Sequence, residues 1–180
     1  MPYATAHILI MLILAKFIRE RSAKKETFPK NYILICAIAA VLPDIDIALY
    51  YILYFFGFSL NEIHRTFTHT IFIPLILFLI GMLFYYNKNK KAGITFSLLS
   101  AGCLLHLILD LLILRKLSLF YPISTLPLGL GLMKYLPKGM QEIILPTIDA
   151  ICIFIWVILF ETKPKKANKN LYKGIPPKHN

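Results

Sequence analysis

Five long apolar runs alternate with shorter polar segments along this chain. They cover residues 4–18, 32–58, 70–86, 94–114 and 143–160. An α-helix needs about 20 residues to cross the hydrocarbon layer of a bilayer, and four of the runs reach or nearly reach this length. The first run is shorter, but no charged segment precedes it and no small-residue cleavage site follows it, so we interpret it as a short span rather than a signal peptide. The pattern predicts an all-α fold, a polytopic membrane helix bundle of about five transmembrane helices.

The composition excludes a soluble globular domain. Apolar side chains make up 58% of the 180 residues, charged side chains make up 16%, and the mean hydropathy is +0.67. The net charge is +11, but the basic residues lie between the apolar runs, so the expected partner is membrane lipid with anionic headgroups and not nucleic acid. The three cysteines are isolated from one another and cannot form a CxxC pair or a zinc knuckle. We therefore expect a multi-pass protein of the cytoplasmic membrane.

Lysine and arginine are distributed unequally between the two sides of the predicted bundle. The segments that follow the first and third runs and the C-terminal tail together hold 15 of them, whereas the other loops hold 5. Because basic loops are retained in the cytoplasm, this asymmetry predicts an N-terminus outside and a C-terminus inside. We expect residues 1–160 to form one helical transmembrane domain and residues 161–180 to form a basic, disordered cytoplasmic tail.

Acidic and imidazole side chains lie within or against the apolar runs. They are Asp44, Asp46, Asp110, Asp149, His7, His69 and His106. A charged side chain at the centre of a bilayer costs about 2.5 to 3.5 kcal/mol on insertion scales. Several such groups in one protein therefore need mutual pairing, water or a metal ion.

Two of these residues have simpler explanations, and one pair does not. His7 could be an interfacial side chain at the start of the first span, and Asp149 could accept hydrogen bonds from backbone amides freed by the proline that precedes it. Asp44 and Asp46, in contrast, follow Pro43 in the middle of the second apolar run. A broken helix at membrane depth is tolerated chiefly where it lines a site inside the protein.

His106 and Asp110 are four residues apart in the fourth run, so a helix would place them on one face, about one turn apart. This geometry suits chelation of a metal ion.

The loop before the third run carries His64, Arg65 and His69 together with two threonines. A ligand role for the two imidazoles and a polar turn in which Thr68 caps the next helix are both open readings of this segment.

The polar side chains converge on the outer leaflet if the N-terminus is outside. Imidazole and carboxylate ligands together suit zinc, manganese or iron. Their number exceeds the three or four ligands that one ion requires, which allows two ions, the arrangement used for in-line displacement at phosphorus.

The complete set of motifs resembles the YdjM-like family, inner-membrane-associated proteins for which metal-dependent hydrolysis is the expected activity. The matching positions are His7, Leu42-Pro43-Asp44-Ile45-Asp46, His64-Arg65-Thr66-Phe67-Thr68-His69, His106 to Asp110, and Gly139 with Glu142. The chain departs from the family pattern at Ile47, where a histidine is frequent, and at residues 111–114, where threonine and glycine are frequent. The order of the motifs also looks like that of the zinc-dependent phospholipase C and P1 nuclease group.

The motifs and the resemblance together imply a membrane-bound hydrolase of a phosphoester, with a lipid among the candidate substrates. The expected ligands of a divalent metal, zinc or alternatively manganese, are His7, Asp44, His64, His69, His106 and Asp110. Asp46 is a candidate ligand or general base, Arg65 a candidate clamp for a phosphate oxygen, and Glu142 a further candidate.

The competing interpretation is a non-enzymatic membrane protein, either a metal or proton transporter or a metal-stabilised structural protein. A relay would need polar groups that continue to the cytoplasmic side, whereas the inner halves of the predicted spans offer no acid or histidine. This distribution favours a site on one side of the membrane. The chain also lacks a GxSxG elbow, an HExxH pair and a Walker loop.

Overall fold

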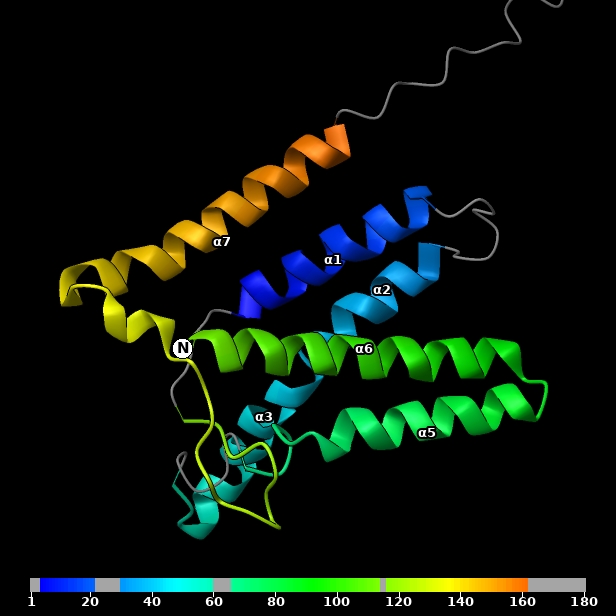
Figure 1. Cartoon of the computed structure of the whole chain (residues 1–180), viewed down its shortest axis with the longest axis horizontal. Helices are drawn as coiled ribbons and strands as arrows, with labels where there is room; N and C mark the ends of the chain where they lie inside the picture. Colours follow the sequence, from blue (N-terminus) through cyan, green and yellow to red (C-terminus); the bar gives the residue numbers. More distant parts are fainter. Residues whose placement is uncertain (1–3, 22–29, 60–65, 114–115, 162–180) are drawn as a thin grey trace, which may run out of the picture.

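The computed structural model describes residues 4–21, 30–59, 66–113 and 116–161 (Figure 1). Its helices are α1 (Ala4–Arg21), α2 (Lys30–Ala39), α3 (Ile45–Leu53), α5 (Phe72–Tyr86), α6 (Lys90–Ile113) and α7 (Lys138–Glu161). Short 3₁₀ turns lie at η2 (Leu42–Asp44), η3 (Tyr54–Phe56) and η4 (Leu132–Tyr135). Extended pairing within these ranges is limited to one isolated bridge, between Leu117 and Leu128. The prediction of an all-α fold is confirmed.

Helix α6 lies at the centre of the arrangement. It packs against α5 to form an antiparallel hairpin, and on its other side it contacts α2 and α1 (Figure 1). Helix α7 packs against α1. The end of α1 at Arg21, the start of α2 and the turn between α5 and α6 all lie toward the same side of the molecule in this view.

Two of the described helices, α6 and α7, are long and apolar enough to cross a membrane by themselves. Residues 31–39 and 42–56 would form a third span if the bent pair is counted as one. Helix α5 is apolar but has only 15 residues, and α1 carries Lys16, Arg19 and Arg21 along its second half. The chain therefore has apolar membrane helices, and the count of five spans stays a prediction.

The second apolar run is broken, as the Pro-Asp-Ile-Asp sequence predicts. Helix α2 ends at Ala39, and the following segment is bent by 50° relative to it. Pro43 has no N–H to give to the carbonyl four residues earlier. The N–H of Asp44 donates to the carbonyl of Val41 at 3.0 Å, and so the carbonyl of Ala40 also loses the partner that a continuous helix would provide.

Side chains of α6 take the place of the missing helical donors. Nδ1 of His106 lies 2.7 Å from the Ala40 carbonyl, and the thiol of Cys103 lies 3.8 Å from the Ala39 carbonyl. Such compensation is required in hydrocarbon, where water cannot satisfy a free carbonyl.

The close approach of α2 to α6 depends on a glycine. A Cβ atom at Gly102 would lie 2.2 Å from the Cβ of Ala39, well inside van der Waals contact. Small residues at such crossings let helix backbones approach closely in membranes. Gly102 lies one turn before His106, so this contact brings the end of α2 within reach of the His106 ring.

The segment from Lys116 to Pro137 is folded over the ends of α5 and α6 rather than extended. Leu117 is fully buried, and the N–H of Leu130 donates to the carbonyl of Leu111 at 2.8 Å. The carbonyl of Leu119 accepts from the N–H of Ile71 at 2.9 Å. This segment therefore holds the start of α5, and the residues just before it, in place.

Candidate metal centre

Six of the polar residues predicted from the sequence meet in one cluster. His7 comes from α1, Asp44 from the bend between α2 and α3, Asp46 from the first turn of α3, His69 from the turn before α5, and His106 and Asp110 from α6. Asp44 is the most accessible member, with 19% of its side chain exposed, whereas the other five side chains are at most 3% exposed. The cluster is thus buried and open mainly at Asp44.

The tautomer of the neutral His106 ring is fixed by its backbone contact. Because a carbonyl oxygen only accepts hydrogen bonds, Nδ1 carries the proton that it donates to Ala40 at 2.7 Å. In the neutral ring, Nε2 is then a bare lone pair. It is buried and faces Oδ1 of Asp44 at 3.6 Å and Oδ2 of Asp110 at 3.8 Å. Three acceptors facing one another in a buried site call for a cation between them.

The distances between the facing atoms fit a shared ion better than direct hydrogen bonds. Nε2 of His69 lies 3.4 Å from Asp44 Oδ1 and 3.7 Å from Asp110 Oδ2, and both distances exceed the usual length of an N–H···O bond. Four ligands placed about 2.1 Å from a zinc ion at the corners of a tetrahedron are about 3.4 Å apart. The group of Asp44, His69 and His106, whose ligand atoms all lie within 4.8 Å of one another, therefore fits a divalent ion in both chemistry and size.

Asp46 has a different environment from the other acids. Its Oδ2 accepts a hydrogen bond from the Thr68 hydroxyl at 2.7 Å and lies 3.3 Å from Nδ1 of His69. A carboxylate in this position fixes the ring orientation of a metal-binding histidine. Thr68 does not cap the next helix, since α5 begins after Ile71 with no side-chain cap. The capping interpretation of Thr68 is therefore wrong, because its hydroxyl donates to Asp46.

The carboxylates around His69 also shift the pKa of its ring. Burial opposes protonation of the ring, but Asp44 and Asp46, together with the charge of Asp110, raise the pKa of His69 above its usual value. A divalent cation would experience the same negative potential.

His7 extends the cluster on the side of α1. Its Nε2 lies 3.5 Å from Oδ1 of Asp110, and its ring lies 4.1 Å from the His106 ring, centroid to centroid. Two groups of three residues have ligand atoms within 4.8 Å of one another, His7 with His106 and Asp110, and Asp44 with His69 and His106. Both groups need Nε2 of His106, and one lone pair binds one ion, so the described residues complete one of these groups at a time.

The remaining candidates are His64, Arg65, Glu142 and Asp149. His64 and Arg65 fall outside the described residues. Glu142 is exposed on α7 and lines a separate groove with Pro146 and Phe154, so the structure does not bring it to the cluster. Asp149 lies within α7, and its Oδ1 is buried without a hydrogen-bond partner among the described residues.

Comparison with known proteins identifies the family. The model of the YdjM inner membrane protein family matches residues 1–168, which include every member of the cluster. The chain belongs to this family. An uncharacterized protein of Bacillus subtilis (strain 168), YvsG, is 30% identical over 97 residues, which are 54% of this chain and 57% of YvsG. The match thus spans little more than half of that relative. No solved structure matches the chain.

The YdjM membership confirms the resemblance drawn from the motifs. Two contributors to the cluster were missed by motif reasoning, the Ala40 carbonyl and the Thr68 hydroxyl as a donor to Asp46. A signal for the first was present, because Pro43 predicts that carbonyls one turn earlier lose their helical partners. Only the packing of α6 against α2 shows which side chain replaces those partners.

Proposed function

We propose that this chain is a membrane-bound, metal-dependent hydrolase of a phosphoester, with one divalent ion held by Asp44, His69 and His106, and with Asp110 beside it. The observation that carries the proposal is the lone pair of His106 Nε2, which faces two buried carboxylates while Nδ1 is committed to a backbone carbonyl. Zinc suits the two imidazoles and the tetrahedral spacing, with manganese as the alternative. The single lone pair of His106 favours one ion over the two that the ligand count allows.

A catalytic role is favoured over a structural one by the exposure of Asp44. Structural zinc sites are closed by protein ligands on all sides, whereas catalytic sites keep one position open. Five members of the cluster are almost inaccessible, but 19% of the Asp44 side chain is exposed, so water and substrate could approach along this edge.

Hydrolysis adds water across a P–O bond, so that the oxygen of water joins phosphorus and the alcohol leaves with a proton. A bound divalent ion supplies an acidified water and neutralises charge on the phosphoryl oxygens. The residues of the chain hold and orient the site: Asp46 and Thr68 fix the His69 ring, and the Ala40 carbonyl fixes His106. This assigns Asp46 a positioning role in preference to that of general base.

The proposal includes a bundle of five spans with the N-terminus outside. Arg19 and Arg21 are at the end of α1 remote from His7, and Lys90 and Lys91 are at the end of α6 remote from Asp110. Basic residues thus gather at the ends of the helices opposite to the cluster. With the positive-inside rule, this supports a cluster near the outer face.

The decisive experiment combines metal content with hydrolysis. Detergent-purified protein is analysed for metals by mass spectrometry and incubated with a panel of lipid and soluble phosphoesters, with release of phosphate or headgroup as the readout. We expect about one ion per chain and hydrolysis of at least one substrate. His106→Ala should lose both ion and activity, whereas Glu142→Gln, which removes an acid away from the cluster, should keep both.

Two results would overturn the proposal. Full metal retention in His106→Ala would remove the ligand assignment. A fully loaded protein that hydrolyses no phosphoester but moves the metal across proteoliposome membranes would favour the transporter.

A further inference from the structure

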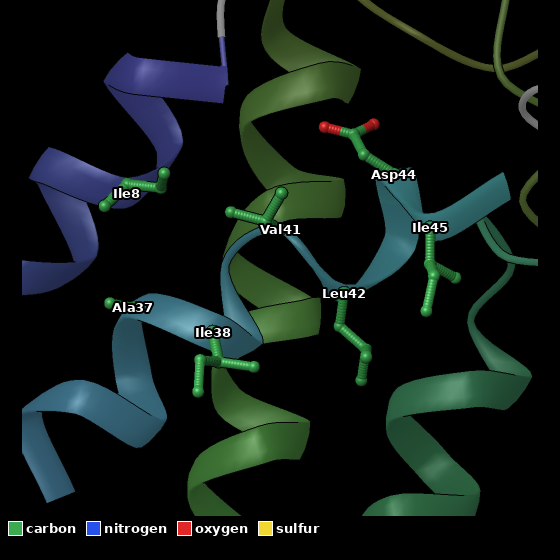
Figure 2. Close-up of a pocket in the computed structure, with 7 residues that line it drawn as sticks. All are labelled: Ile8, Ala37, Ile38, Val41, Leu42, Asp44 and Ile45. Atoms are coloured by element: carbon green, nitrogen blue, oxygen red, sulfur yellow. The ribbon is translucent and has the colours of Figure 1, made fainter. Parts of the chain in front are cut away.

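An apolar groove begins at Asp44, the most accessible carboxylate of the cluster. It has a volume of about 460 Å³ and lies along the bend between α2 and α3 (Figure 2). Its apolar lining consists of Ile8, Ala37, Ile38, Val41, Leu42 and Ile45. Asp44 is the one polar side chain among the lining residues and lies at one end of the group, with Ala37 and Ile38 toward the other.

The groove and the cluster are built from neighbouring residues. Helix α1 presents His7 to the cluster and the next residue, Ile8, to the groove. Asp44 serves both, because its Oδ1 lies 3.4 Å from Nε2 of His69 while its side chain lines the groove. A molecule whose polar end reaches the cluster past Asp44 would therefore have its remainder in apolar surroundings.

The outer side of the groove is exposed and apolar. Ile38 is 54% exposed and Ile45 is 58% exposed. From Asp44 the lining crosses the bend to Ala37 and Ile38 in α2. A volume of about 460 Å³ lies within the usual range of ligand pockets and has room for the first part of an acyl chain.

We infer that this groove binds the acyl chain of a lipid phosphoester whose phosphate lies at the metal cluster. The inference rests on the proposed function and specifies its substrate class. A lipid has the matching polarity at both ends, a charged phosphate for the cation and a hydrocarbon chain for the apolar lining. The acyl chain of a lipid already lies in the hydrocarbon of the bilayer before it binds to the protein. Binding in the groove therefore orients the lipid and adds little hydrophobic free energy. Its effect should therefore be on the positioning of the phosphate.

The test blocks the groove and uses two readouts. Ala37→Phe places a ring in the groove, and Ala150→Phe makes the same change in a groove on α7 that contains no member of the cluster. The probe is a phosphatidic acid with a photoreactive diazirine in one acyl chain, and crosslinked residues are mapped by mass spectrometry. Hydrolysis is measured in parallel with phosphatidic acid and with glycerol phosphate, which carries the same phosphate without acyl chains.

We expect crosslinks at the groove residues in the wild type and in Ala150→Phe, and their loss in Ala37→Phe. Hydrolysis of phosphatidic acid should fall at least tenfold in Ala37→Phe, whereas metal content and hydrolysis of glycerol phosphate stay within twofold. If Ala37→Phe does not fold, Ile38→Trp replaces it, with Leu79→Trp on α5 as a control of similar exposure.

The two proposals fail in different ways. Crosslinking in the groove without hydrolysis of any phosphoester would refute the hydrolase and keep the lipid site. If Ala37→Phe leaves the hydrolysis of both substrates unchanged, and crosslinks form elsewhere or not at all, the lipid site is refuted and the hydrolase is kept. Intermolecular crosslinks between groove residues of two chains would show that a second copy occupies the groove, which also refutes the inference.

Discussion

Replacing Asp46 by asparagine tests whether this acid positions a metal ligand or accepts a proton. The substitution keeps the size of the side chain and removes its charge. Asp46 lies 3.3 Å from Nδ1 of His69, and across the ring this places its charge about 7 Å from an ion on Nε2. Its attraction for a divalent ion at that distance is about 1 kcal/mol in water and about 5 kcal/mol at an effective dielectric constant of 20.

Carboxylates behind metal-binding histidines contribute about 10 to 100-fold to metal affinity, or about 1.4 to 2.7 kcal/mol, which lies between these limits. We therefore expect the metal dissociation constant to rise 10 to 100-fold in Asp46→Asn. The measurement is competition with a chromogenic chelator in detergent.

Thr68→Val provides a graded comparison. It removes the hydroxyl that donates to Asp46 at 2.7 Å but leaves the carboxylate, so the dissociation constant should rise only about 2 to 10-fold. An unchanged dissociation constant in Asp46→Asn, together with a lost hydrolysis rate at saturating metal, would refute the positioning role and restore that of general base.

Three further predictions concern packing, chemistry and topology. Gly102→Ala should separate α2 from α6 and lengthen the contact between His106 and the Ala40 carbonyl, so metal affinity should fall at least tenfold in the same chelator assay. Gly139→Ala is the control, because a Cβ atom there meets no atom within 4 Å, and it should leave metal affinity unchanged. Arg65→Lys keeps the charge but loses the two-pronged donor set, so phosphoester hydrolysis should fall steeply while metal content holds; full activity would remove the phosphate clamp. Single cysteines at positions 61 and 169, in a chain without the native cysteines, should be labelled by an impermeant thiol reagent in intact cells only at Asn61, and labelling only at Lys169 would invert the topology.

The members of the cluster could be predicted from the sequence because polar residues are conspicuous among apolar neighbours. His7, Asp44, His69, His106 and Asp110 stand out against apolar neighbours, and all five meet in the cluster. In a soluble protein, the same residue types would be hidden among many surface acids and histidines.

The division of roles within the cluster could not be predicted from the sequence. Asp44 and Asp46 are two residues apart in one motif, yet one faces His106 and the other faces the back of the His69 ring. This difference depends on the 50° bend and on the turn that presents Thr68, both of which are tertiary features. The apolar pattern also does not determine the number of spans. The run at residues 32–58 is long enough for one span, yet it folds as two short helices, α2 and α3.

The bend at Pro43 also has a consequence for how an ion could enter and leave. The carbonyls of Ala39 and Ala40 take their donors from α6, so any opening between α2 and α6 would leave two acceptors unsatisfied in hydrocarbon. His69 instead comes from a turn outside the helices, which is joined to the segment folded over it by the backbone bond from Ile71 to Leu119 and by the contact between the Phe67 and Tyr121 rings. We expect this turn to be the part of the cage that opens, and the rate of ion exchange to follow the stability of the loop contact at Ile71 rather than that of the helix bundle.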